Sequence, residues 1–165
     1  MLNNKTVEEL LEVYSNIEIE LKNRGVIRTS NLTGELAEYY ALKYLKSWNN
    51  EMELILEPPS TKDFDIKDIK SNLSFSVKGI KGKNNKTSIF DRVNHKNELN
   101  PKKIFDYAVV VKFNYKYQID QVYLLSWDVF LIHRNWHSTM KGWDLTITNN
   151  FKLDDKVIKL SPHSK

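Results

Sequence analysis

Two predicted strands, residues 63–68 and 73–80, carry residue types that suit metal-assisted hydrolysis of a phosphodiester. That chemistry needs hard oxygen ligands for a divalent cation, a group that holds or activates water, and a positive charge near the developing negative charge. Apolar and polar residues alternate in both segments, and the turn-forming residues between them predict a short hairpin. Such a hairpin would bring the carboxylate of Asp65 and the ammonium of Lys78 to one position of the sheet.

Side chains on these two strands are expected to alternate between the faces of the sheet. Two pairs then share the polar faces: Asp63 with Asp65 on the first strand, and Ser76 with Lys78 on the second. Taken alone, each aspartate is more simply a solvated strand residue, and Lys78 is one more surface lysine. The prediction of chemistry therefore depends on their joint occurrence.

Two amphipathic helices are predicted before these strands. Thr6 and Glu9 form a T-x-x-E capping box, and apolar residues then recur at helical spacing up to Leu21. A glycine follows this run at the position where helices often end. A second helix is predicted to begin near Thr33 and to fade near Trp48.

The second helix carries a further candidate acid. On a helical wheel, Glu38 borders the buried stripe around Ala41, whereas Glu35 points nearly away from that stripe. Glu38 can therefore face the sheet. The alternative is that Glu38 covers a helix edge in a weak surface ion pair with Lys43 or Lys46.

The remaining hydrophobic pattern predicts the rest of a mixed sheet and its cover. Residues 107–113 form a nearly continuous apolar run, typical of a strand covered on both faces, and 118–125 is its predicted hairpin partner. Further predicted elements are a short strand at 52–56, a helix capped by Ser126 and running through Ile132, and edge strands at 143–148 and 157–160. This order indicates an α/β fold, a three-layer α/β/α sandwich with a central mixed sheet.

The 165 residues suit a single domain, with helices at 6–48, a catalytic sheet core at 52–125, and a C-terminal helix with edge strands at 126–165. No apolar run reaches the roughly 18–20 residues of a membrane span, and the N-terminus lacks the apolar core of a signal peptide. No cysteine is present for a disulfide or a thiolate zinc site. These features favour a cytoplasmic protein with no membrane partner.

The histidines offer a weaker candidate site. His133 and His137 have the i, i+4 spacing of a helical metal pair, but the sequence between them lacks the glutamate of an HEXXH motif. His95 is predicted to be a polar residue of a loop.

Positive charge is concentrated in the segment from Lys78 to Lys103, where eight basic residues stand against two acidic ones. This basic segment carries a net charge of +6, whereas the whole chain carries +4. Such a local excess points to a polyanion such as DNA, and a solvated lysine-rich loop is the alternative. The residues expected to contact DNA are Lys81, Lys83, Lys86, Arg92 and Lys96.

In order and spacing, these motifs resemble the PD-(D/E)xK nuclease superfamily, which includes many type II restriction enzymes, Holliday-junction resolvases and phage exonucleases. The matching stretches are Gly34 to Glu38, Phe64-Asp65, Ser76 to Lys78 and Phe105 to Val111, within about residues 20–125. The pattern is most similar to an uncharacterised bacterial branch of this restriction endonuclease-like superfamily.

The resemblance implies a role for each matching residue. Asp65 and the carbonyl of Val77 would be ligands of Mg²⁺, which Mn²⁺ can replace, and Lys78 would contact the attacking water or the scissile phosphate. Ser76 stands where the family has its middle acid and cannot supply a carboxylate. Glu38 matches an additional helix glutamate and is the candidate to compensate, as catalytic residue and metal ligand. Loss of catalysis with retention of the DNA-binding fold is the alternative.

The sequence thus predicts a metal-dependent DNA endonuclease, similar to type II restriction enzymes. Enzymes of that kind that cut both strands generally work as symmetric dimers, so a homodimer is expected. Two alternatives stay open: a catalytically inactive nucleic-acid-binding module of the same fold, and a protein-interaction domain that uses the aromatic C-terminal region.

Overall fold

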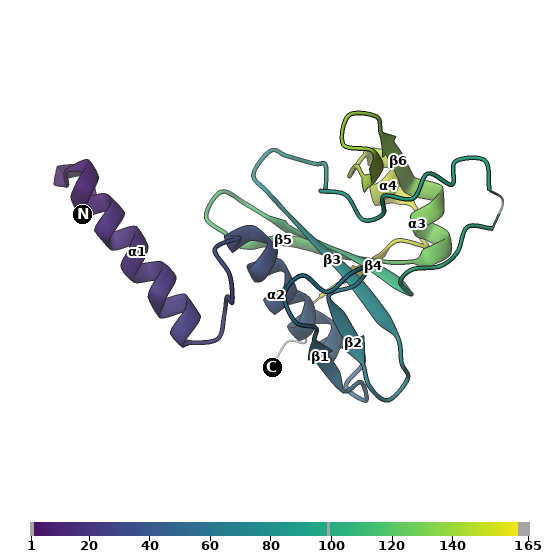
Figure 1. Cartoon of the computed structure of the whole chain (residues 1–165), viewed down its shortest axis with the longest axis horizontal. Helices are drawn as coiled ribbons and strands as arrows, with labels where there is room; N and C mark the ends of the chain where they lie inside the picture. Colours follow the sequence, from purple (N-terminus) through teal and green to yellow (C-terminus); the bar gives the residue numbers. More distant parts are fainter. Residues whose placement is uncertain (1, 99, 162–165) are drawn as a thin grey trace.

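A six-stranded mixed sheet lies at the centre of the computed structural model, which describes residues 2–98 and 100–161 (Figure 1). The strand order is β1-β2-β3-β4-β5-β8, with β3 and β4 parallel and the other neighbours antiparallel. The strands are β1 (Leu54–Leu56), β2 (Ile66–Asp68), β3 (Ser74–Lys81), β4 (Tyr107–Phe113), β5 (Ile119–Ser126) and β8 (Ile158–Leu160). The expectation of an α/β fold with a central mixed sheet is confirmed.

One face of the sheet is covered by α2 (Leu32–Trp48). Asn31 caps this helix, because its side chain accepts a backbone N–H of the first turn. Ala37, Ala41 and Leu45 are fully buried and pack with apolar residues of β3, β4 and β5. Removal of this apolar stripe from water is the main contribution that holds α2 on the sheet.

The other face carries a second apolar cluster, built from C-terminal elements and from the segment 82–106 between β3 and β4. These C-terminal elements are α3 (Trp127–His133), β6 (Arg134–His137), β7 (Gly142–Leu145) and α4 (Asn149–Leu153). β6 and β7 form a separate two-stranded sheet, and the outer edge of this sheet is bridged by Lys86 and Asp91. The expectation that 143–148 would form an edge strand of the main sheet is therefore wrong. β7 pairs with β6 instead, and the segment 82–106 lies along the other edge of β7.

α1 (Val7–Asn23) extends away from the sheet (Figure 1). The capping box of Thr6 and Glu9 is present, and Gly25 ends the helix with a φ of 66°. No residue of α1 is buried, and only Leu21 near its end packs against the core. The predicted helix forms, but most of its apolar stripe has no partner within the described residues. No helix of residues 2–98 and 100–161 has the length and apolar character needed to cross a membrane.

β2 and β3 form the predicted hairpin, with Ile66 opposite Phe75. β2 is shorter than the expected strand at 63–68, because Asp63 has a φ of 78° and an extended chain cannot continue through the left-handed region. Asp63 and Asp65 therefore do not share a strand face. Asp65 lies just before β2, where the hairpin opens.

Gly79 of β3 allows a close approach of α2. A β-carbon at this position would lie 2.6 Å from the carbonyl oxygen of Thr33 and 2.9 Å from the β-carbon of Ala37. Only a residue without a side chain permits this helix-to-strand distance. The contact fixes the N-terminal half of α2, which carries Glu38, directly over β3.

We predict that Gly79→Ala lowers the free energy of unfolding by about 1–3 kcal/mol, because the added methyl group must displace Thr33 and Ala37. Urea unfolding followed by circular dichroism measures the change. Gly25→Ala is the matched control, since nothing lies within 4 Å of its β-carbon and only backbone strain is introduced. A Gly79→Ala protein as stable as the wild type would contradict the close approach.

Candidate active site

Asp65 lies at the point where the pairing of β2 with β3 ends. Its Oδ2 atom accepts a hydrogen bond from the backbone N–H of Val77 at 2.6 Å, and its own N–H donates to the carbonyl of Phe75 at 2.9 Å. The N–H and C=O of one strand residue point to the same side, so the carbonyl of Val77 also faces this edge. A carboxylate and a backbone carbonyl, both hard oxygen donors, therefore adjoin each other.

Glu38 lies on α2 near Asp65, and its side chain is 18% exposed. Burial is the largest cause that raises the pKa of Glu38 to about 7, and the negative charge of Asp65 adds to it. The guanidinium of Arg28 acts in the opposite direction without cancelling this rise. A carboxylate whose ionisation is opposed by burial and by a neighbouring negative charge favours a cation nearby.

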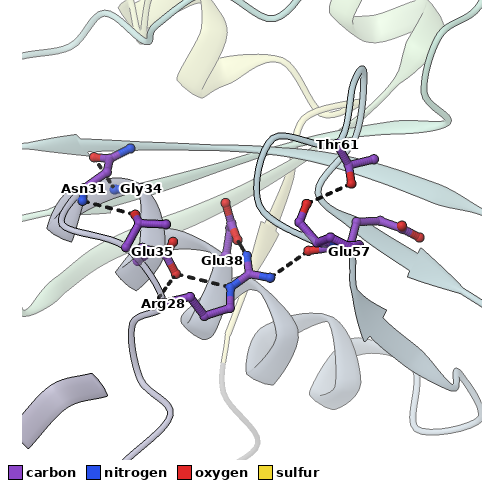
Figure 2. Close-up of polar contacts among 9 residues, drawn as sticks. Arg28, Asn31, Gly34, Glu35, Glu38, Glu57 and Thr61 are labelled. Carbon is purple, nitrogen blue, oxygen red and sulfur yellow. Dashed lines mark hydrogen bonds and ion pairs between the residues drawn. The ribbon is translucent and has the colours of Figure 1, made fainter. Parts of the chain in front are cut away.

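Arg28 connects Glu38 to neighbouring groups, as Figure 2 shows. Its Nη2 donates to Oε2 of Glu38 at 2.5 Å, and its Nη1 donates to the carbonyl of Glu57 at 2.6 Å. Its backbone N–H and its Nε donate to Oε2 of Glu35, at 2.9 and 3.4 Å.

Glu35 is buried, with 7% of its surface exposed, although the helical wheel pointed it away from the apolar stripe. That interpretation is wrong because the chain before α2 folds over the first turn of the helix and brings Arg28 onto Glu35. A helical wheel contains no such contact. Sequence reasoning therefore missed both members of this ion pair.

Ser76 and Lys78 lie on the opposite face of β3 from Val77. Val77 belongs to the apolar cluster under α2, whereas Ile80 belongs to the cluster on the other face, and side chains alternate between them. Ser76 is 2% exposed and adds no charge to the edge where Asp65 lies.

The ammonium of Lys78 lies 5.5 Å from the ring centroid of Phe90. Among the described residues, no ion pair joins Lys78 to Asp65 or to Glu38. Asp65 and Lys78 are therefore not directly paired among the described residues, and their convergence on one site stays a prediction. Asp65 turns its carboxylate to the backbone of β3 at the strand edge, while Lys78 follows the alternation of the strand to one face.

The groups at this edge fit a divalent cation with oxygen ligands. Oδ1 of Asp65 and Oε1 of Glu38 have no hydrogen-bond partner within the described part of the chain, and the carbonyl of Val77 faces the same edge. Mg²⁺ is typically held by one or two carboxylates and retains several waters. In residues 2–98 and 100–161, no three Asp, Glu or His side chains are grouped closely enough to hold a metal. A bound ion would therefore depend on the backbone carbonyl and on water.

The residues expected to contact DNA differ in what they already contact. Lys83 and Lys96 are exposed and form no ion pair within the described residues. The other three have contacts: Lys81 lies 3.6 Å from the ring centroid of Tyr117, Lys86 pairs with buried Asp144 at 3.1 Å, and Arg92 donates to the carbonyl of Met140 at 2.8 Å. Lys83 and Lys96 therefore offer the most available charge.

Buried polar contacts hold the segment 82–106 against the sheet. His95 is 3% exposed and contacts Asp91 at 2.5 Å and Arg134 at 2.7 Å through its two ring nitrogens. Lys112 donates to two backbone carbonyls at the start of the segment. His95 lies in a loop, as predicted, but it is buried there and forms part of a polar anchor.

His133 and His137 do not share a helix face. His133 is the last residue of α3 and contacts Asp154 at 2.7 Å, whereas His137 belongs to β6. Their spacing in the sequence therefore does not create a helical metal pair.

The chain is similar to known proteins in structure but not in sequence family. No protein-family model matches the chain, and no curated protein matches it. The structure of a bacterial homing endonuclease, I-Ssp6803I, is similar over 78% of this chain and 84% of that chain, with 15% sequence identity and a TM-score of 0.42. Similarity at that level assigns neither a family nor an activity, so membership of the PD-(D/E)xK superfamily stays a prediction.

We predict that Glu38 takes up a proton near pH 7 in the metal-free protein, and that Asp65→Asn lowers its pKa by removing a like charge. The ¹³C chemical shift of the Glu38 carboxyl group, followed by NMR across the pH range, measures this pKa. The folded protein retains this proton at pH values where the unfolded chain has lost it. The associated stability is therefore fully present below pH 4.5 and is lost as the pH rises to about 7.

Asp63→Asn is the matched control for this titration, because Asp63 is exposed and is not among the groups that shift the pKa of Glu38. This variant should titrate as the wild type does. If Asp65→Asn also leaves the pKa of Glu38 unchanged, the two carboxylates do not interact and the candidate site is wrong.

Proposed function

We propose that this protein is a metal-dependent DNA endonuclease whose active site lies where β2 and β3 diverge. One observation carries the proposal: Glu38 is largely buried close to the carboxylate of Asp65, which is itself bonded to the backbone of Val77, and burial together with the charge of Asp65 raises the pKa of Glu38 to about 7. Each carboxylate retains an oxygen without a protein partner among the described residues. This arrangement supports a cation site, to which α2 would contribute Glu38 in addition to covering one face of the sheet.

Asp65, Glu38 and the carbonyl of Val77 would hold Mg²⁺, with Mn²⁺ as a substitute. A bound ion of this kind lowers the pKa of a coordinated water and stabilises charge on a phosphate oxygen. The bond from the N–H of Val77 orients the carboxylate of Asp65 for this task. Glu38 would supply the charge that Ser76 lacks.

Lys78 would stabilise negative charge on the scissile phosphate. Its ammonium must first leave the ring of Phe90, a change that its flexible four-carbon stem permits without moving β3. The basic segment lies on the same face of the sheet as Lys78, because its residues Phe90 and Phe105 belong to the apolar cluster of that face. Lys83 and Lys96 would contact DNA phosphates directly.

We also propose that two copies of the chain pair through α1, since cleavage of both DNA strands requires two symmetry-related active sites. The apolar residues of α1 recur at alternating intervals of three and four, the seam of paired helices: Val7, Leu10, Tyr14, Ile17 and Leu21. All but the last are exposed. Lys22 and Arg24 at the end of α1 pair with Glu18 and Glu20 of the same helix, so the apolar seam rather than charge would drive the pairing.

We predict that Tyr14→Lys converts a dimer into a monomer, because it places a charge at the centre of the α1 seam. Size-exclusion chromatography with light scattering should give twice the chain mass of 19.5 kDa for the wild type. Ile19→Lys is the matched control, since Ile19 is similarly exposed on the opposite side of α1. A wild-type protein that stays monomeric at every concentration would rule out this pairing.

We predict that duplex DNA is cleaved in Mg²⁺ or Mn²⁺, and that Asp65→Asn abolishes cleavage by removing a ligand charge. Lys78→Ala should slow cleavage roughly 10²–10³-fold, the usual effect of losing one group that stabilises transition-state charge. Conversion of a supercoiled plasmid to nicked and linear forms measures the rate.

Asp63→Asn and Lys67→Gln are charge-matched controls on the same hairpin and should cleave as the wild type does. Cleavage that survives Asp65→Asn would exclude the site assignment.

A catalytically inactive DNA-binding module of the same fold is the second candidate. It is favoured by the ion pair that Arg28 forms with Glu38, and by the contact of the Lys78 ammonium with the ring of Phe90 in place of an ion pair with either carboxylate among the described residues. No metal would then support cleavage, while binding would weaken with salt. Lys83→Gln or Lys96→Gln would each lower the salt slope by about one. Absence of DNA binding at low salt would exclude both candidates.

A further inference from the structure

Arg28 lies outside every motif that pointed to the candidate site, yet its guanidinium contacts both Glu38 of α2 and the backbone carbonyl of Glu57, the residue after β1 (Figure 2). Resting on the function proposed above, we infer that Arg28 is a positioning residue that fixes Glu38 of α2 relative to Asp65 at the edge of β3. It contacts the proposed metal site through other residues and would not touch the DNA.

A path of hydrogen bonds through Arg28 and the backbone of Glu57 joins the carboxylate of Glu38 to the backbone carbonyl of Asp65. On one side, Nη2 of Arg28 donates to Glu38 at 2.5 Å. On the other, Nη1 donates to the carbonyl of Glu57 at 2.6 Å, and the N–H of Glu57 donates to the carbonyl of Asp65 at 2.9 Å. The guanidinium plane therefore sets the distance between the helix and the segment that precedes β2.

Arg28 is itself held in place by Glu35. The carboxylate of Glu35 accepts the backbone N–H of Arg28 at 2.9 Å and its Nε at 3.4 Å. The side chain of Glu35 is only 8% exposed, and its backbone N–H donates to the carbonyl of the cap residue Asn31 at 3.0 Å. Both ends of the Arg28 side chain are thus fixed, as positioning requires.

A simpler role for Arg28 would be to neutralise the negative charges of Glu35 and Glu38 without positioning them. A lysine would neutralise Glu35 and Glu38 equally well. A lysine would lack the planar guanidinium, which donates hydrogen bonds to Glu38, to Glu35 and to the carbonyl of Glu57 at the same time. The two roles therefore predict different behaviour for Arg28→Lys.

The test measures plasmid cleavage by the full chain as a function of Mn²⁺ concentration. For Arg28→Lys we expect the concentration at half-maximal rate to rise about 10–100-fold, the usual effect of losing a group that orients a ligand. The rate at saturating Mn²⁺ should fall much less, because Asp65, Glu38 and Lys78 are all retained. Glu35→Gln, which also leaves the proposed ligands intact, should shift the metal dependence in the same direction.

Arg24→Lys is the matched control, since Arg24 is exposed and, among the described residues, its side chain pairs with Glu20 of α1 alone. Its metal dependence should equal that of the wild type. An Arg28→Lys protein with wild-type metal dependence would overturn the inference and leave only charge neutralisation.

Amide hydrogen exchange without metal gives a second readout that does not require cleavage. The N–H groups of Val77 and Glu57 both donate to Asp65. In Arg28→Lys these two N–H groups should exchange a few-fold to about tenfold faster than in the wild type. The amides that pair β4 with β5 should exchange at the wild-type rate in this variant. In Arg24→Lys, the exchange rates of Val77 and Glu57 should stay unchanged. If the wild-type protein neither binds Mn²⁺ nor cleaves DNA, the proposed function is wrong, but the inference about Arg28 is not contradicted.

If the exchange rates of Val77 and Glu57 are unchanged in Arg28→Lys, the inference about Arg28 is wrong.

Discussion

The hydrogen bond from the backbone N–H of Val77 to the carboxylate of Asp65 is the constraint on which the candidate site depends. β2 pairs with β3 only as far as Ile66 and Phe75, so the next donor of β3 on that side has no strand partner. A buried donor left unsatisfied costs about 1–3 kcal/mol, and a carboxylate is a strong acceptor. The side chain of Asp65 thus replaces a neighbouring strand and is oriented by the backbone itself.

α2 brings further negative charge to this fixed point. Gly79 lets the helix lie close to β3, and Glu35 and Glu38 of its first turns then share a single guanidinium, that of Arg28. Asp65 adds a third negative charge near Glu38. Burial of Glu38, together with the negative charges of Asp65 and Glu35, raises its pKa to about 7, so this excess of negative charge is reduced when Glu38 holds a proton. A divalent cation would relieve the same excess, which is why packing of α2 and metal affinity are expected to be coupled.

Local signals in the sequence were sufficient for most elements but not for the polar contacts between them. The capping box at Thr6 places α1, and alternation places the β2–β3 hairpin. Arg28 lies in a segment without periodicity, and its partners are 7 to 29 residues away, so no spacing rule joins them. The prediction that Asp63 and Asp65 share a strand face was wrong because Asp63 adopts a left-handed conformation that alternation cannot reveal. Such positions are decided by tertiary packing rather than by local preference.

The groups that the proposed nuclease mechanism requires are distributed over the two faces of β3. Lys78 and the basic segment belong to one face, Glu38 belongs to the other, and Asp65 lies at the edge between them. A phosphate can contact both faces only from beyond that edge, where β2 has ended and no strand covers β3. The short length of β2 is therefore a functional requirement under the proposed mechanism. A longer β2 would satisfy the N–H of Val77 with a strand partner and close the one place where acids and lysine can reach a common substrate.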